Sequence, residues 1–152
     1  MREIPPTAGL PLRLRDLLAR EPQPLEEGLK HFLGVPRLRV ECSGTAALVV
    51  SLTALKRRSA RRRVIVPAYT CPLVAFAVLH CGLVPVPCDV RAGDFQFDLG
   101  QLSGLCDRNT LALIPTHLGG RVAEVAPVQD TARRHGAAVI EDAPGARRIS
   151  PR

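Results

Sequence analysis

Two kinds of apolar segment alternate along the chain. Short apolar stretches, rich in β-branched residues, are typical of buried strands. Longer segments with apolar positions at helical spacing lie between them. The predicted strands are 37–42, 64–66, 83–88, 110–115 and 137–141. The predicted helices are 24–33, 43–57, 72–81, 99–106 and 125–135, with a polar connection at 94–98.

This alternation predicts an α/β fold with a mostly parallel sheet flanked by helices. In such folds a ligand binds beyond the carboxyl ends of the strands. Three features follow predicted strands: the turn Ser43-Gly44-Thr45, then His117, and finally Asp142. We therefore expect these three features to converge on one crevice.

The composition is that of a globular protein of 152 residues, with 46% apolar and 23% charged residues. This excludes a disordered or fibrous chain and favours one compact domain. Five cysteines form an odd set without a C-x-x-C pair, which argues against a disulfide framework and a zinc ribbon. We therefore expect no metal site and a reducing, cytoplasmic environment.

The net charge of +7 raises the question of an anionic partner. The densest basic run lies at 57–63 and is interpreted as a solvated connection, because no aromatic residues interleave with it. Nucleic acid is therefore not an expected partner. Segment 64–88 contains no Asp, Glu, Lys or Arg and is long enough to span a bilayer. Four prolines nevertheless divide it into pieces of strand and helix length. It is interpreted as a buried strand-helix-strand unit, and no membrane partner is expected.

The turn at Ser43-Gly44-Thr45 has two interpretations. Ser43 is a preferred N-cap residue, so the turn can simply begin a helix. Free N–H groups and the positive end of the helix dipole also favour a phosphate, which Gly44 would allow to approach closely and Thr45 could bind with its hydroxyl. Neither a P-loop nor a dinucleotide fingerprint is present.

Asp142 stands at the exit of the apolar stretch 138–140. A carboxylate there can cap the following turn, or it can hold a cationic ligand atom. A cation about 4 Å away would interact by about 4 kcal/mol at an effective dielectric near 20, which is enough to keep a ring nitrogen protonated. His117 can contact a ligand or serve as a hydrogen-bonded structural residue.

Several motifs in order resemble one family. They are Glu41-Cys42-Ser43-Gly44-Thr45-Ala46-Ala47-Leu48, Val64-Ile65-Val66-Pro67-Ala68-Tyr69-Thr70, Gly82-Leu83-Val84-Pro85-Val86, Ile114-Pro115-Thr116-His117-Leu118-Gly119-Gly120 and Val139-Ile140-Glu141-Asp142-Ala143. Together they resemble the DegT/DnrJ/StrS family of pyridoxal-phosphate-dependent sugar aminotransferases. The resemblance covers residues 25–146.

The resemblance implies part of a type I aminotransferase large domain, with pyridoxal 5'-phosphate as cofactor. It implies a homodimer that transfers an amino group from an amino acid donor to a keto-sugar nucleotide, in the biosynthesis of polysaccharide or antibiotic sugars. Gly44 and Thr45 would bind the cofactor phosphate, Asp142 would pair with the pyridine nitrogen, and His117 would contact the cofactor. Cys71 occupies the position where the family commonly places an aromatic residue on the cofactor ring.

The family's Schiff-base lysine would follow the Asp142 motif and is absent, since the only lysines are Lys30 and Lys56. No catalytic residue is therefore assigned. The expected organisation is an N-terminal segment at 1–24, a partial large domain at 25–146 and a tail at 147–152. The chain is interpreted as the N-terminal part of such an enzyme. The alternatives are a non-catalytic phosphate-binding pseudo-enzyme or interaction module, and an unrelated basic α/β protein.

Overall fold

The computed structural model describes residues 24–119 and 121–144. The chain divides into two compact units, one comprising Met1–Val40 with Arg147–Arg152 and the other Glu41–Ala146. The expected division at residues 24 and 146 stays a prediction. The expected tail, and all of the expected N-terminal segment except Pro24, lie outside the described residues.

The first unit contains α2 (Leu25–Leu33), which confirms the predicted short helix. The helix ends at Gly34, whose φ of 65° is the left-handed conformation that glycine adopts at little cost. The predicted strand at 37–42 is wrong: these residues form neither helix nor strand. The backbone N–H of Val40 donates to the Glu26 carboxylate instead of a strand partner. Alternating apolar residues do not make a strand without a neighbour to pair with.

The larger unit is built on a four-stranded sheet in the order β2-β1-β3-β4. The strands are β1 (Arg63–Pro67), β2 (Val84–Cys88), β3 (Thr110–Leu113) and β4 (Ala138–Val139). All three pairings are parallel, which confirms the predicted fold class. The two later strands are shorter than the predicted 110–115 and 137–141. The chain beyond β3 and β4 stays paired through an isolated parallel bridge between Thr116 and Asp142.

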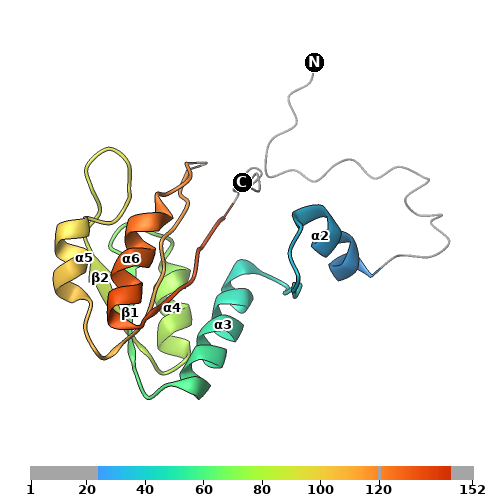
Figure 1. Ribbon diagram of the computed structural model, residues 1–152, viewed down its shortest axis with the longest axis horizontal. Coiled ribbons are helices and arrows are strands. Elements are labelled where there is room, and N and C mark those ends of the chain that lie inside the picture. Colours follow the sequence, from blue (N-terminus) through green and yellow to red (C-terminus); the bar gives the residue numbers. More distant parts are fainter. Residues whose placement is uncertain (1–23, 120, 145–152) are drawn as a thin grey trace. The chain divides into compact units, whose positions relative to one another are not determined.

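Four helices of this unit cover the two faces of the sheet (Figure 1). They are α3 (Gly44–Arg58), α4 (Pro72–His80), α5 (Leu99–Leu105) and α6 (Val125–His135). Val64 and Val66 of β1 pack with α3 and α4, whereas Ile65 packs with α5 and α6. Alternate residues of one strand therefore fill two separate cores, because strand side chains alternate between the faces of a sheet.

β2 lies at an edge of the sheet and contains two prolines. The N–H of Val84 donates to the carbonyl of Arg62. The backbone N–H and C=O groups of Val84, and of the residues two and four positions later, therefore point toward β1. Pro85 and Pro87 take the alternate positions, where a backbone N–H would point away from β1. Proline is tolerated there because no neighbouring strand needs the missing donor.

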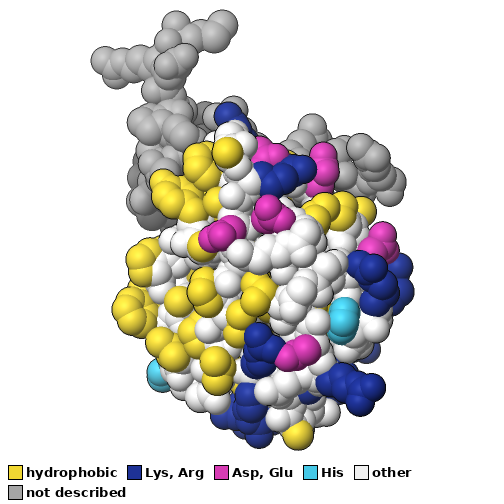
Figure 2. Space-filling view, turned by 90° about the vertical axis from the view of Figure 1, so that its left-hand side faces the viewer, with side chains coloured by type: hydrophobic (Ala, Val, Ile, Leu, Met, Phe, Trp, Pro, Cys, Tyr) yellow, Lys and Arg dark blue, Asp and Glu magenta, His cyan; other side chains and the backbone are white. Residues whose placement is uncertain are grey.

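Apolar and basic side chains gather on different parts of the surface in the space-filling view (Figure 2). The exposed large apolar residues of α4 are Leu73, Phe76 and Leu79. Within the described part of the chain, none of the helices has the length and apolar character that crossing a membrane requires.

Candidate functional site

The first component of the site is the start of α3. Ser43 is the N-cap, and its Oγ accepts a hydrogen bond from the N–H of Ala46 at 3.1 Å. The N–H of Ala47 is satisfied by the carbonyl of Ser43 at 3.0 Å. The N–H groups of Gly44 and Thr45 precede the first intrahelical bond and have no acceptor among the described residues. The N-cap interpretation is therefore confirmed, and two donors remain free for a ligand.

Gly44 is not required by the fold of the described residues. Its φ lies outside the left-handed region, and a Cβ added at this position would meet no atom within 4 Å. The space beside its backbone is thus open. Such a position suits a ligand that must approach the helix N-terminus closely, because a phosphate binds best where N–H groups are unobstructed.

The second component lies where β3 and β4 end. The N–H of Asp142 donates to the carbonyl of Pro115 at 3.0 Å, and the N–H of His117 donates to the carbonyl of Asp142 at 2.8 Å. These bonds continue the parallel pairing beyond both strands. Of the three features expected to converge on one crevice, His117 and Asp142 therefore lie together at the carboxyl edge, joined by backbone hydrogen bonds.

Both ring nitrogens of the buried His117 contact other residues. Nδ1 accepts a hydrogen bond from the N–H of Ala123 at 2.9 Å. Nε2 lies 3.2 Å from the carboxylate of Glu141. Because Nδ1 accepts, Nε2 carries the proton that faces Glu141. Sequence reasoning missed Glu141, although its place directly before Asp142 at the end of a strand was a usable signal. A polar contact between His117 and a cofactor stays a prediction, and it would require one of these bonds to open.

The Asp142 carboxylate is half-buried and has no hydrogen-bond or ion-pair partner among the described residues. Burial raises its pKa above the ordinary value of 3.8, and the nearby His117 acts in the opposite direction. A partly desolvated carboxylate without a cation is destabilised in its charged form. The arrangement therefore favours a cationic group from a ligand.

One cavity connects these two components. It has a volume of about 390 Å³. It is lined by Gly44, Ala47, Leu48, Ser51, Ile140, Glu141, Asp142, Ala143 and Pro144. The start of α3 and Asp142 thus line the same space, although Gly44 and Asp142 are 98 positions apart in the sequence. Within the described residues, no group of three or more potential metal ligands occurs.

The other three predicted site residues, Thr45, Cys71 and His117, are not among the residues that line this cavity. Thr45 lines a second hollow between α3 and α4, of about 460 Å³. Cys71 is exposed and immediately precedes α4. It follows Thr70, whose hydroxyl lies 3.3 Å from that of Thr116. This contact joins the turn after β1 to the same carboxyl edge that carries Asp142, so Cys71 begins a helix at that edge.

Lys56, the lysine of the larger unit, is not among the residues that line the cavity. Lys56, near the end of α3, donates from Nζ to the carbonyl of Cys81 at 2.6 Å. Lys30, on α2, pairs with Glu27. That neither residue takes the role of the family's Schiff-base lysine stays a prediction.

The donor set fits a phosphorylated pyridine. Such a molecule carries an anion that suits the open N–H groups at Gly44 and Thr45. Its ring nitrogen suits the Asp142 carboxylate, which has no partner among the described residues, because a half-buried carboxylate and a protonated nitrogen stabilise each other.

Comparisons with known proteins place this arrangement in a family. The sequence model of the DegT/DnrJ/EryC1/StrS aminotransferase family matches residues 17–148. The chain belongs to this family. The aminotransferase family depends on pyridoxal 5'-phosphate, and solved neighbours include a PLP form.

Among the curated relatives of this aminotransferase family, the GDP-perosamine synthase of Caulobacter vibrioides is 35% identical over 118 residues. That match covers 78% of this chain and 32% of the relative. Helicobacter pylori PseC, an aminotransferase of pseudoaminic acid biosynthesis, shares the fold with a TM-score of 0.72 and 29% identity. The structural match covers 80% of this chain and 33% of PseC.

A putative sugar aminotransferase of Streptococcus pneumoniae in its PLP form is 28% identical, with a TM-score of 0.68. That likeness covers 75% of this chain and 29% of the neighbour. The chain therefore spans about a third of the length of these aminotransferases. The recognition of the family from its ordered motifs is confirmed.

Proposed function

We propose that the larger unit is the cofactor-holding part of a pyridoxal-phosphate-dependent sugar aminotransferase. The observation that carries this proposal is the cavity lined by both Gly44, at the start of α3, and Asp142, whose carboxylate has no partner among the described residues. One end of the cavity suits a phosphate and the other suits a protonated ring nitrogen. The family to which the chain belongs supports the same cofactor.

When bound, pyridoxal 5'-phosphate supplies an electron sink for the carbanion left when an amino-bearing carbon loses its proton. The residues of this chain hold that group in place. The N–H groups of Gly44 and Thr45, with the Thr45 hydroxyl, bind the phosphate. Asp142 holds the proton on the ring nitrogen and so keeps the ring electron-poor. Cys71 contacts the ring in place of an aromatic residue.

The main role that we propose for His117 is to hold the backbone around Asp142 in place. Its backbone N–H bonds the carbonyl of Asp142, and its ring ties Glu141 to the N–H of Ala123. These contacts fix the chain on both sides of the Asp142 carboxylate. We assign to His117 the role of orienting that carboxylate, alongside its predicted contact with the cofactor.

The substrate class that we propose is a keto-sugar nucleotide, with an amino acid as the amino donor. Support comes from the GDP-perosamine synthase relative, whose name specifies a nucleotide-linked sugar. We further propose a homodimer as the complete assembly and the cytoplasm as its location. The five free cysteines support a reducing compartment.

A second candidate is a phosphate-binding module without transferase activity. The observation in its favour is that Lys56 donates to the carbonyl of Cys81 and Lys30 pairs with Glu27, so both amines are already engaged. Both candidates use the same binding site. They differ only in whether a reactive amine is supplied to it.

Pyridoxamine 5'-phosphate tests the binding site directly, because it needs no lysine. We expect saturable binding by fluorescence titration, and we expect Gly44→Val to weaken it by at least about tenfold, since the new side chain occupies the open approach to the helix N-terminus. Gly104→Val is the matched control, because Gly104 also faces open space in a helix. Equal affinity in the Gly44→Val variant would show that the phosphate does not bind at this turn.

Asp142→Asn tests the other end of the cavity. We expect the variant to retain bound pyridoxamine 5'-phosphate but to lower the pKa of its ring nitrogen, because the charge partner is lost. An absorbance titration of the bound compound against pH measures this pKa. An unchanged ring pKa would mean that Asp142 does not face the nitrogen.

Activity is tested by adding the part of a relative that this chain does not span. Joining residues 1–146 to the carboxyl-terminal part of a close relative would supply a lysine and the rest of the domain. We expect slow amino transfer to a keto-sugar nucleotide, with most turnover lost in the Asp142→Asn version. A soluble, dimeric chimera with no turnover would favour the binding module.

A further inference from the structure

A pair of exposed aromatic rings lies on the same edge of the sheet as the cavity. Tyr69 and Phe95 are stacked with their centroids 5.1 Å apart and their planes 22° apart. They are 59% and 40% exposed, respectively. Tyr69 adjoins Thr70, which contacts Thr116, and Thr116 pairs with Asp142. The aromatic pair is thus linked to the candidate cofactor site through two neighbouring strand ends.

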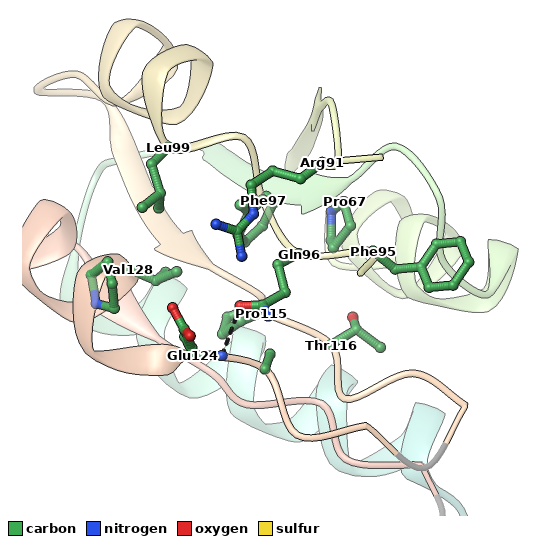
Figure 3. A pocket seen from close by; sticks show the side chains of 12 residues that line it. Pro67, Arg91, Phe95, Gln96, Phe97, Leu99, Pro115, Thr116, Glu124 and Val128 are labelled. Carbon is green, nitrogen blue, oxygen red and sulfur yellow. Dashed lines mark hydrogen bonds between the residues drawn. The ribbon is translucent and has the colours of Figure 1, made fainter. Parts of the chain in front are cut away.

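Phe95 is held in a strained conformation. Its φ of 59° makes it the one non-glycine residue with positive φ among the described residues. A bulky side chain is strained in this region and persists there only when the surroundings impose it. Burial does not explain the strain, since the ring remains substantially exposed and points away from the small cavity on whose rim it lies (Figure 3).

The loop that carries Phe95 is fastened on both sides of the strained residue. Arg91 donates its backbone N–H to the carbonyl of Gln96, and the N–H of Gln96 donates to the carboxylate of Asp94. The side chain of Gln96 accepts from the N–H of Glu124 at 2.9 Å, the bond drawn in Figure 3. The loop is therefore rigid where it presents the ring to solvent.

Two guanidinium groups contact the same loop. Arg91 pairs with Asp94 at 2.5 Å, and Arg121 donates to the carbonyl of Gly93 at 2.7 Å. The side chain of Arg91 reaches across the small cavity in Figure 3. That cavity has a volume of only about 10 Å³, so it is too small for an organic ligand. A ligand would lie over the loop, with cationic groups available for an anion.

We propose that Tyr69 and Phe95 form a platform on which the base of a nucleoside diphosphate stacks, with Arg91 and Arg121 providing positive charge for its diphosphate. Flat aromatic bases stack on exposed side-chain rings, and guanidinium groups match phosphate oxygens. This inference rests on the proposed function, because the nucleoside diphosphate would be the carrier portion of the sugar substrate. It assigns that portion to the β1 and β2 side of the carboxyl edge.

The sequence provides a direct reporter of the platform, because Tyr69 is the only tyrosine and tryptophan is absent. We expect GDP to shift the ring resonances of ¹³C-labelled tyrosine in a saturable way, at a concentration where sedimentation shows one species. Guanosine and pyrophosphate should each bind more weakly than GDP. Shifts of equal size with pyrophosphate alone would overturn the stacking role. Shifts that follow protein concentration instead of GDP would mean that a second copy covers the rings.

Phe95→Leu keeps an apolar side chain but removes the flat ring. We expect equilibrium dialysis with labelled GDP to show binding about five- to a hundredfold weaker, the range for one lost stacking contact. Phe76→Leu is the matched control, because Phe76 is also an exposed phenylalanine of this unit. Phe95→Asn should lose GDP binding while its unfolding midpoint is unchanged or raised, because asparagine tolerates positive φ. Undiminished GDP binding by Phe95→Leu would overturn the proposal.

Pyridoxamine 5'-phosphate binding separates this inference from the proposed function. If the Phe95 variants lose GDP but retain pyridoxamine 5'-phosphate, both proposals are supported. If the wild-type protein binds pyridoxamine 5'-phosphate through Gly44 and GDP leaves Tyr69 unchanged, the platform alone is wrong. If GDP shifts Tyr69 and pyridoxamine 5'-phosphate does not bind, the cofactor site is wrong and the platform stands as a nucleotide site.

Discussion

At the scale of single residues, the half-buried Asp142 carries a cost in stability that its proposed role in binding would offset. Its carboxylate is half-buried, and burial raises its pKa. A raised pKa in the folded state means that the folded chain binds the proton more tightly than the unfolded chain does. Stability is therefore lost as the pH rises through the folded pKa. A cationic ligand atom would remove that cost.

This reasoning predicts that Asp142→Asn stabilises the ligand-free protein near neutral pH, because the variant has no carboxylate to ionise. Urea unfolding at several pH values measures the effect. The gain should shrink as the pH falls toward 3.8, the ordinary value for an aspartic acid, where the wild-type residue also becomes neutral. A gain that is constant with pH would show that the charge is not its cause.

At the scale of elements, Arg61 connects segments that are distant in sequence. One of its guanidinium nitrogens, Nη1, donates to the carbonyls of Thr110, His135 and Gly136, at 3.1, 2.9 and 2.6 Å. It thereby joins the segment before β1 to the start of β3 and to the end of α6. A cation at a helix C-terminus also interacts favourably with the helix dipole. This contact gives one residue of the basic run a structural role.

We expect Arg61→Ala to lower the free energy of unfolding by about 1.5–3 kcal/mol, the range for hydrogen bonds to a charged group. Arg57→Ala is the control, since Arg57 is exposed at the end of α3 and should change stability by less than about 0.5 kcal/mol. Chemical denaturation of both variants makes the comparison. Equal losses would show that general positive charge matters rather than the Arg61 contacts.

Most elements of the larger unit could be predicted from the sequence because local signals agreed with packing. Ser43 and Pro72 marked helix starts, and the apolar stretch at 64–66 marked a buried strand. The segment at 37–42 carried a similar pattern, but nothing in the sequence shows that it lacks a pairing strand. Pairing is a long-range property, so local periodicity cannot decide it.

The site could be predicted in outline, since strand ends and a helix start indicated the relevant residues. The sequence could not show that His117 contacts Glu141 and Ala123, because those bonds depend on how the chain turns after β3. It could not show the stacking of Tyr69 on Phe95 either. That contact depends on the left-handed backbone conformation of Phe95, in a segment for which the sequence predicted only a polar connection.

At the scale of the whole larger unit, α4 departs from the usual amphipathic pattern. It is apolar on all sides, with Leu73, Phe76 and Leu79 exposed. Helices that are hydrophobic all round are normally buried, and clustered exposed apolar residues mark contact surfaces. The isolated chain is therefore expected to self-associate.

Phe76→Glu should shift the protein toward the monomer, because a charge on the apolar face opposes its burial. Sedimentation velocity over a range of concentrations measures the change. Val122→Glu is the control, since Val122 is exposed to a similar degree on a different segment. A wild-type chain that stays monomeric at high concentration and melts cooperatively would instead favour a self-sufficient binding module.

The prolines of β2 make the growth of the sheet directional. A strand approaching β2 from outside finds no N–H donor at Pro85 or Pro87, so this side resists both strand exchange and edge-to-edge aggregation. β4 has no such block. An additional strand, from the same polypeptide or from another, therefore extends this sheet more readily past β4, on the side where Asp142 lies.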